Sequence, residues 1–370
     1  MPTQDAVLEQ LATVDDPEIG KPITELGMVE EVVIDGGRVG VKVKLTVPGC
    51  PLKDTITREV TAAVQRLDDV TEVQVAFGSM NEQERSALSS QLRSERGAGN
   101  ADMTIPFAQA DSRTRVIAIA SGKGGVGKSS VTANLAVALA RKGHEVGILD
   151  ADIWGYSIPR MMGAEGRPVA FEGMVMPLQA HGVKLISIGF FTDPDRSVIW
   201  RGPMLHRALQ QFLADVYWGD LDFLLMDLPP GTGDVAISLA QMLPNAEMLV
   251  VTTPQPAAQK VALRAGKATE ETGMSVAGVI ENMTGFTDPA SGTVHEIFGS
   301  GGGQLLADEL DTKLLARIPI DPRLRAGSDE GVPIVAADPD APASVEITKV
   351  ADEMIARANS VIGRSLPLSV

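Results

Sequence analysis

The feature that most constrains the fold of this chain is a glycine-rich segment, SGKGGVGKSS, at positions 121–130. It contains the spacing G-x-x-x-x-G-K-S, with which backbone N–H groups surround phosphate at the start of a helix. The apolar run RVIAIA precedes it, and SSVTANLAVAL follows with the apolar spacing of a helix. A strand, a phosphate loop and a helix in this order predict a nucleotide-binding α/β fold.

More short apolar runs follow this segment along the chain. They are EVGILD, FLLMDL, EMLVVTT and VAGVIE, and helical segments separate several of them. This alternation predicts a doubly wound, mostly parallel sheet within residues 113–370, with ligand sites at the carboxyl ends of its strands. Aromatic residues make up only 4% of the chain, so the core must be mostly aliphatic, which suits a parallel sheet covered by helices.

Residues 1–78 predict a separate, small α/β domain. The run RVGVKVKLTV alternates with a period of two, ITREVTAAVQRL has helical spacing, and TEVQVAF alternates again. Residues 79–112 are rich in Ser, Glu, Arg, Gln and Gly, a composition that favours a mobile linker, although part of it is compatible with a helix.

The composition limits the partners that we expect. The chain has 370 residues, 48 acidic against 32 basic, and a net charge of −16, which disfavours bulk attraction to nucleic acid or anionic lipid. The amino-terminal segment is polar, and no apolar run approaches the ~18 residues that span a bilayer. We expect a cytoplasmic protein without nucleic-acid or stable membrane partners. The basic residues of KVALRAGK and the tail VIGRSLPLSV leave DNA and membrane contact as alternatives.

The phosphate loop predicts ATP and Mg²⁺ as cofactors. Lys128 is expected to reach the β- and γ-phosphates, and the Ser129 hydroxyl to bind Mg²⁺. The predicted nucleotide-contacting residues of the loop are Gly122, Lys123, Gly124, Gly125, Val126, Gly127, Lys128, Ser129 and Ser130.

Carboxylates follow two other predicted strands. Asp227 ends the strand FLLMD, where a second carboxylate should hold Mg²⁺ through water. Asp150 and Asp152 follow EVGIL, where they could coordinate the water shell of the metal and orient the attacking water. Each Asp by itself is also compatible with a helix cap or a solvated turn. Their shared position at strand ends favours the metal site.

The phosphate loop resembles the deviant Walker A motif, K-G-G-x-G-K-[ST], of the MinD/ParA/nitrogenase-iron-protein group of P-loop NTPases. In that group the first lysine contacts the nucleotide of a partner subunit. The resemblance implies a homodimer in which Lys128 serves its own ATP and Lys123 serves its neighbour's, as an arginine finger does in trans. A solvated loop charge is the alternative for Lys123.

Longer motifs resemble the Mrp/ApbC branch, ATPases associated with carrying iron–sulfur clusters. They are LDADIWGYSIP, WRGPM, LDFLLMDLPPGTGD, VTTPQ and ENMTGF…IFGSGGG. The segments VDDPEIGKPITELGMV and LTVPGCPLKD are similar to the small (MIP-type) domain of iron–sulfur targeting factors. The resemblance implies that Asn282 recognises the adenine and that the segment around Pro319 borders the base.

The chain departs from the pattern of that branch at its cluster ligands. Cluster-carrying members have C-P-x-C after E-N-M, whereas Asp288 and Ser291 stand at those positions here. Carboxylate and hydroxyl are poor ligands for iron–sulfur clusters, which favour thiolate. The chain has one cysteine, Cys50, at a predicted helix start that can lower the pKa of its thiol. Cys50 is therefore either an iron–sulfur ligand or a packing residue of the turn.

These observations predict a homodimeric switch that binds ATP and hydrolyses it slowly. It would act in iron–sulfur cluster carriage or assembly, with client or assembly proteins as partners. The alternative is a ParA/MinD-like scaffold or positioning protein without metal cargo. The missing cysteines favour this alternative, and the longer motifs favour the carrier.

Overall fold

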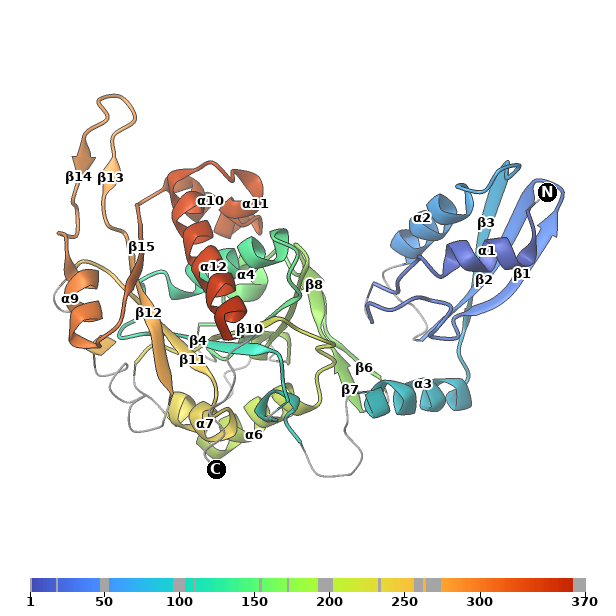
Figure 1. The fold of residues 1–370 in the computed structure, drawn as a ribbon, viewed down its shortest axis with the longest axis horizontal. Coiled ribbons are helices and arrows are strands. Elements are labelled where there is room, and N and C mark those ends of the chain that lie inside the picture. Colours follow the sequence, from blue (N-terminus) through green and yellow to red (C-terminus); the bar gives the residue numbers. More distant parts are fainter. Residues whose placement is uncertain are drawn as a thin grey trace. The chain divides into compact units, whose positions relative to one another are not determined.

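The fold is that of a computed structural model, which divides the chain into two compact units (Figure 1). It describes residues 2–17, 19–46, 53–95, 104–109, 111–152, 155–171, 173–191, 202–231, 234–255, 262–263 and 274–361. Unit 1 comprises Met1–Thr104, Val169–Pro177 and Asp215–Gly219, and unit 2 comprises Ile105–Pro168, Leu178–Ala214 and Asp220–Val370. Cys50, Lys260, Arg264, Lys267 and the tail from residue 362 lie outside the described residues.

Unit 1 is built on a three-stranded sheet in the order β1-β2-β3, with β2 antiparallel to β1 and parallel to β3. Its elements are α1 (Gln4–Leu11), β1 (Val29–Asp35), β2 (Arg38–Leu45), α2 (Lys53–Val64), β3 (Glu72–Ser79), α3 (Glu82–Glu95) and the hairpin β6 (Val169–Phe171)–β7 (Met174–Met176). The predicted alternation in β2 is confirmed, since Val39, Val41, Val43 and Leu45 are buried. The helical spacing of α2 is confirmed in the same way by buried Ile56, Val60 and Val64.

The stretch expected as a linker contains helix α3. Two features of its sequence explain the helix. Asn81 and Glu84 form reciprocal caps, because each side chain accepts the backbone N–H of the other at 2.9 Å. Leu88 and Leu92, four residues apart, are buried in the core of unit 1. Lys44 Nζ, on β2, also lies 2.6 Å from Glu84 Oε1. The domain limits proposed from the sequence stay a prediction.

Unit 2 is built on an eight-stranded sheet in the order β15-β12-β11-β4-β10-β5-β9-β8. The strands are β4 (Arg115–Ser121), β5 (Val146–Asp150), β8 (Leu178–Ala180), β9 (Val183–Ser187), β10 (Phe223–Asp227), β11 (Glu247–Thr252), β12 (Ser275–Asn282) and β15 (Leu314–Ile318). All neighbours are parallel except β8 and β9. The predicted doubly wound, mostly parallel sheet is confirmed.

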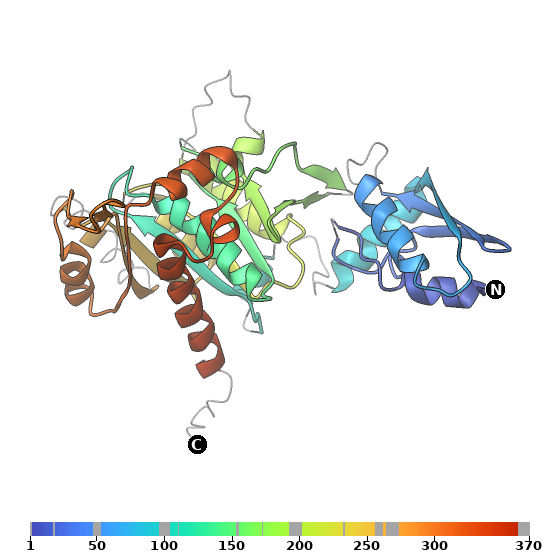
Figure 2. The same ribbon diagram turned by 90° about the horizontal axis from the view of Figure 1, so that it is seen from above.

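Helices cover both faces of this sheet. They are α4 (Lys128–Arg141), α5 (Ile158–Met161), α6 (Gly202–Ala214), α7 (Asp234–Met242), α9 (Gly302–Glu309), α10 (Pro322–Glu330), α11 (Ile334–Ala337) and α12 (Pro342–Val361), with 3₁₀ turns η1 (Pro106–Ala108) and η2 (Ile188–Phe191). Figure 1 shows α4, α10, α11 and α12 on one side and α6 and α7 on the other. Because α12 packs on α4 (Figure 2), α4 is buried almost all round, which explains its apolar sequence.

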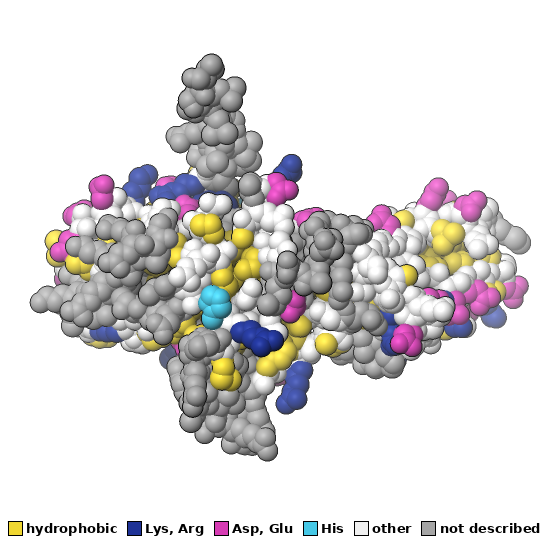
Figure 3. Space-filling view, turned by 90° about the horizontal axis from the view of Figure 1, so that it is seen from below, with side chains coloured by type: hydrophobic (Ala, Val, Ile, Leu, Met, Phe, Trp, Pro, Cys, Tyr) yellow, Lys and Arg dark blue, Asp and Glu magenta, His cyan; other side chains and the backbone are white. Residues whose placement is uncertain are grey.

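The surface around α6 carries exposed apolar side chains. Met204 of α6 is 48% exposed, and Phe212 stacks on Phe191 with ring centroids 5.5 Å apart. The face of the molecule seen from below shows hydrophobic side chains beside basic ones (Figure 3). In the described part of the chain, no helix has the length and apolar character required to cross a bilayer.

Candidate functional site: a phosphate loop and its carboxylates

The glycine-rich loop joins β4 to α4, and its conformation requires glycine. Gly125 and Gly127 have φ values of 78° and 85°, in the left-handed region that side chains disfavour. Gly127 is the N-cap of α4, and a Cβ there would lie 2.2 Å from Asn282 Nδ2. The helix therefore begins at Lys128, and its first N–H groups are free to bind an anion.

A cavity of about 510 Å³ lies over this loop. Its lining residues are Ser121, Lys123, Gly124, Gly125, Val126, Gly127, Lys128, Ser129, Ser130, Asp152, Gly155, Ser157, Met161, Pro229 and Pro230. All predicted loop residues except Gly122 line it. Asp152 lines it from the turn after β5, so the structure brings the loop and this carboxylate to one cavity.

Asp227 is the centre of the hydrogen bonds below the loop. Its side chain is fully buried, and Oδ2 accepts from Lys128 Nζ at 2.7 Å and from Ser129 Oγ at 2.6 Å. Oδ1 accepts from Thr132 Oγ1 at 2.8 Å. Lys128 is only 6% exposed, so this ion pair is largely shielded from water. The Lys128 ammonium has three N–H donors and also lines the cavity, so phosphate oxygens could accept from it beside Asp227.

Asp150 lies beside Asp227 because β5 and β10 are adjacent and parallel, with Asp150 opposite Asp227 in the register. Asp150 is fully buried, and Oδ2 accepts from Ser187 Oγ at 3.0 Å. Burial, and then the negative charge of Asp227, raise the pKa of Asp150 to about 8. The positive charge of Lys128, which is paired with Asp227, opposes this increase.

Asp152 is a turn residue that also lines the phosphate cavity, and its predicted part in metal binding stays a prediction. Its Oδ1 accepts the backbone N–H of Gly155 at 3.0 Å, as in a turn, and its side chain also lines the phosphate cavity. The donor set fits Mg²⁺, which binds hydroxyl and carboxylate oxygens while it keeps several waters. The described residues contain no cluster of three or more His, Cys, Asp or Glu side chains able to hold a metal by themselves. A metal here would depend on Ser129, water and phosphate oxygens as well.

Lys123, the additional lysine of the loop, does not share the partner of Lys128. Its Nζ donates to Gln255 Oε1 at 2.7 Å, and its carbonyl oxygen accepts from Ser121 Oγ at 3.1 Å. Gln255 follows β11, the strand next to β4.

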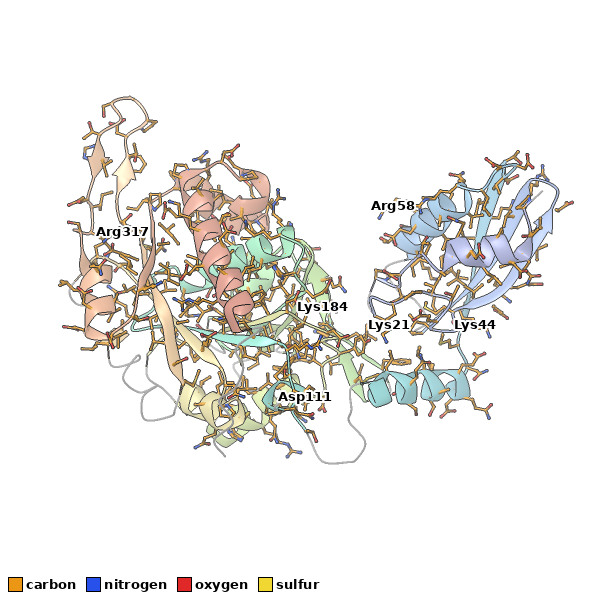
Figure 4. All side chains as sticks on the ribbon, in the orientation of Figure 1. Lys21, Lys44, Arg58, Asp111, Lys184 and Arg317 are labelled. Atoms are coloured by element: carbon orange, nitrogen blue, oxygen red, sulfur yellow. The ribbon has the colours of Figure 1, made fainter. Side chains whose placement is uncertain are left out.

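Asn282 and Pro319 lie in different surroundings. Asn282 ends β12, is buried, and donates from Nδ2 to the carbonyl oxygen of Val126 at 2.8 Å, so it supports the loop directly. Pro319 follows β15 and lines a second cavity of about 540 Å³ with Thr284 and Arg317. Figure 4 shows Arg317 on β15, near the base of the hairpin β13 (Phe286–Thr287)–β14 (Val294–His295). The structure thus brings Asn282 to the backbone of the phosphate loop, whereas neither Asn282 nor Pro319 lines the phosphate cavity.

Asp288 and Ser291 form the turn of this hairpin. Asp288 Oδ1 accepts from the backbone N–H groups of Ala290 at 2.8 Å and Ser291 at 3.3 Å. Ser291 Oγ accepts from the N–H of Thr293 at 3.3 Å. The hydrogen bond from Ala290, followed by that from Ser291, lowers the pKa of the Asp288 carboxyl. Both side chains therefore serve the backbone of their own turn.

Three residues of the site were not predicted from the sequence: Thr132, Ser187 and Gln255. Thr132 lies one helical turn after Lys128, a spacing that could have indicated a shared partner. Ser187 ends β9, which is adjacent to β5, and only the strand order brings its hydroxyl to Asp150. Gln255 belongs to the motif VTTPQ, which carried the family resemblance without a stated role.

Comparison with known proteins gives two family matches. Residues 112–355 match the ParA family, described as NUBPL iron-transfer P-loop NTPase. Residues 4–75 match a family described as iron-sulfur cluster assembly protein.

Curated relatives align over nearly the whole chain. One from Mycobacterium tuberculosis is 53% identical over 98% of this chain and 96% of the relative, and one from Synechocystis sp. is 40% identical over 97% and 99%. Both are named iron-sulfur cluster carrier protein.

Solved structures share the fold of unit 2. A nucleotide-binding protein from Archaeoglobus fulgidus, in complex with ADP, is 38% identical with a TM-score of 0.51, covering 59% of this chain and 86% of that chain. The septum site-determining protein MinD from Pyrococcus horikoshii, complexed with Mg-ADP, is 27% identical with a TM-score of 0.50, covering 67% and 98%. The family match over residues 112–355 is consistent with the phosphate-loop geometry of the structure. The chain belongs to the NUBPL iron-transfer P-loop NTPase family.

Proposed function

We propose that this protein is a Mg²⁺-dependent ATPase that acts as a dimeric switch in the carriage or assembly of iron–sulfur clusters in the cytoplasm. The convergence of Lys128, Ser129 and Asp227 under the phosphate loop carries the nucleotide part of the proposal. The names of relatives that align over nearly the whole chain support the iron–sulfur part.

The proposed reaction uses Lys128, Ser129 and Asp152, which line the cavity, and Asp227 and Asp150, which are hydrogen-bonded to these residues. The loop N–H groups and Lys128 would bind the phosphates, and Ser129 and Asp227 would hold Mg²⁺. Mg²⁺ would supply neutralisation of the phosphate charge. Asp152 orients the attacking water, and Asp150 supports the water shell of the metal.

Dimerisation follows from Lys123 in this proposal. Its ammonium would neutralise phosphate charge in the second subunit, so that hydrolysis depends on a closed dimer. Asn282 and the segment around Pro319 would bind the adenine. Hydrolysis is expected to be slow, because partners time such switches.

Removal of the Lys128 ammonium tests the nucleotide site. Lys128→Ala should abolish tight ATP binding and leave Asp227 as an unpaired buried carboxylate. Equilibrium binding of a fluorescent ATP analogue measures the loss, and Lys142→Ala, at the far end of α4, is the control. Wild-type affinity in Lys128→Ala would contradict the proposed site.

The cluster is the cargo in this proposal, and its ligands need a separate test. Asp288 and Ser291 are engaged in their own turn, so we propose that a labile cluster depends on Cys50, at two thiolates per dimer. Anaerobic reconstitution of the full chain with iron and sulfide should give visible charge-transfer absorption, and Cys50→Ala should remove it. The double change Asp288→Cys with Ser291→Cys restores C-P-x-C and should strengthen the absorption.

The same turn favours a second candidate, an ATP-dependent scaffold or positioning protein without metal cargo. The hydrogen bonds of this turn use Asp288 Oδ1 and Ser291 Oγ, and carboxylate and hydroxyl oxygens are poor ligands for iron–sulfur clusters. The scaffold becomes the better conclusion if the wild-type chain never takes up iron while Lys128 remains essential for ATP binding.

A further inference from the structure

The side chain of Lys123 meets Gln255 because their strands are neighbours. β4 and β11 are parallel, with Val251 opposite Ser121. Lys123 lies two residues beyond Ser121, and Gln255 lies four residues beyond Val251. Both side chains therefore emerge at the carboxyl edge of the sheet, where Nζ and Oε1 are 2.7 Å apart.

The backbone at Lys123 is held separately from its side chain. Ser121 Oγ donates to the carbonyl oxygen of Lys123 at 3.1 Å, and Gly231 N donates to the carbonyl oxygen of Ser121 at 2.8 Å. Within the described residues, Gln255 is the hydrogen-bond partner that the structure gives to the Lys123 ammonium. Among the described residues, this one side-chain contact therefore fixes the position of the ammonium.

The chemistry of the contact differs from that of Lys128. Lys128 pairs with a carboxylate at a buried position, which holds it by full charge. Lys123 is half-buried and bonds to a neutral amide, so it is held by an ion–dipole interaction. Such a bond orients an ammonium but is weaker than an ion pair with the same geometry.

We infer that Gln255 is a positioning residue for Lys123. The Gln255 side chain holds the Lys123 ammonium within its own subunit, and this bond must break before the ammonium can contact the nucleotide of a second copy. The inference rests on the proposed trans role of Lys123. An amide in this position restrains the lysine and still releases it, whereas a carboxylate would retain it. Gln255 therefore sets the protein concentration at which two ATP-bound subunits form a dimer.

The first test measures the contact without reference to dimerisation. Full-length protein without added nucleotide is treated with an amine-reactive ester, and labelling of Lys123 is followed by peptide mass spectrometry. In Gln255→Leu, Lys123 should be labelled about tenfold faster than in the wild type, because loss of a hydrogen bond from a charged donor corresponds to a factor of about ten. Lys142 is the internal reference amine, and Gln304→Ala, an exposed glutamine on α9, should match the wild type.

The second test measures dimerisation with a non-hydrolysable ATP analogue by analytical ultracentrifugation. Gln255→Leu should lower the dimer dissociation constant about tenfold because no bond must break. Gln255→Glu should raise it roughly twofold to fivefold above the wild-type value, because the charge of a partly exposed carboxylate adds that much to the hydrogen bond. A general disturbance of the site would move both variants in the same direction, and that result would overturn the inference.

Lys123→Ala separates failure of the inference from failure of the proposed function. If Lys123→Ala loses dimerisation while Gln255→Leu labels Lys123 at the wild-type rate, the role of Gln255 is wrong and the trans role stands. If Lys123→Ala dimerises and hydrolyses ATP normally, the trans role is wrong, and the inference is overturned with it.

Discussion

Asp227 shows how much one buried carboxylate can organise. Lys128, Ser129 and Thr132 all donate to it, and in the proposed mechanism Lys128 also binds phosphate and Ser129 also binds Mg²⁺. Thr132 has no proposed role in binding phosphate or metal. Its single hydroxyl hydrogen can go to Asp227 or to the carbonyl oxygen of Lys128 at 3.0 Å, and the carboxylate is the stronger acceptor.

Replacement of Thr132 tests this role at the residue scale. Thr132→Val keeps the shape of the side chain but removes the donor to Asp227 Oδ1. We expect the ATP hydrolysis rate to fall about tenfold, equivalent to ~1.4 kcal/mol, with a smaller change in ATP affinity. Single-turnover kinetics measure both. Thr132→Ser keeps the hydroxyl and should retain the rate, and equal loss in the two variants would contradict the role.

Strand order assembles the site at the scale of elements. β10 lies between β4 and β5, so the phosphate loop, Asp227 and Asp150 all lie at the carboxyl edge of three adjacent strands. On the other side of β4, β11 brings Gln255, and the next strand, β12, brings Asn282 to the loop. Hairpin β13–β14 follows β12 and is closed by hydrogen bonds of its own turn.

Helix α3 gives a prediction at the same scale. Its first turn depends on the reciprocal hydrogen bonds of Asn81 and Glu84. Asn81→Ala should destabilise this end by ~1 kcal/mol and speed amide hydrogen exchange in the first turn of α3 about fivefold. Ser86→Ala, an exposed change in the same helix, is the control. Unchanged exchange in Asn81→Ala would show that packing of Leu88 and Leu92 alone maintains the helix.

Net charge is the property of the whole molecule that bears on partners. At −16, the chain should be repelled by the phosphate backbone of DNA, in contrast to a scaffold that binds chromosomes. Fluorescence anisotropy of labelled duplex DNA, with a non-hydrolysable ATP analogue at physiological salt, should detect no binding. Affinity in the range of ordinary non-specific binders, about 10⁻⁴ to 10⁻⁶ M, would favour the scaffold function.

Local sequence determined the features that depend on neighbours along the chain. The phosphate loop, the alternation in β2 and the apolar runs of the large sheet were predictable, because backbone geometry and burial repeat over a few residues. The cap of α3 was equally local, as NEQE, but the polar composition around it favoured a linker. The sequence alone also shows that positions 288 and 291 are not cysteine.

Tertiary structure decided which distant residues meet. Lys123 and Gln255 are 132 positions apart, and Asn282 and Val126 are 156 apart. Side chains of β6–β7, such as Phe171 and Met174, belong to the core of unit 1, although more than 60 residues of unit 2 separate them in sequence from the first segment of unit 1, Met1–Thr104. These contacts follow from strand order and register, which are set by the packing of the whole sheet and its helices rather than by any local pattern.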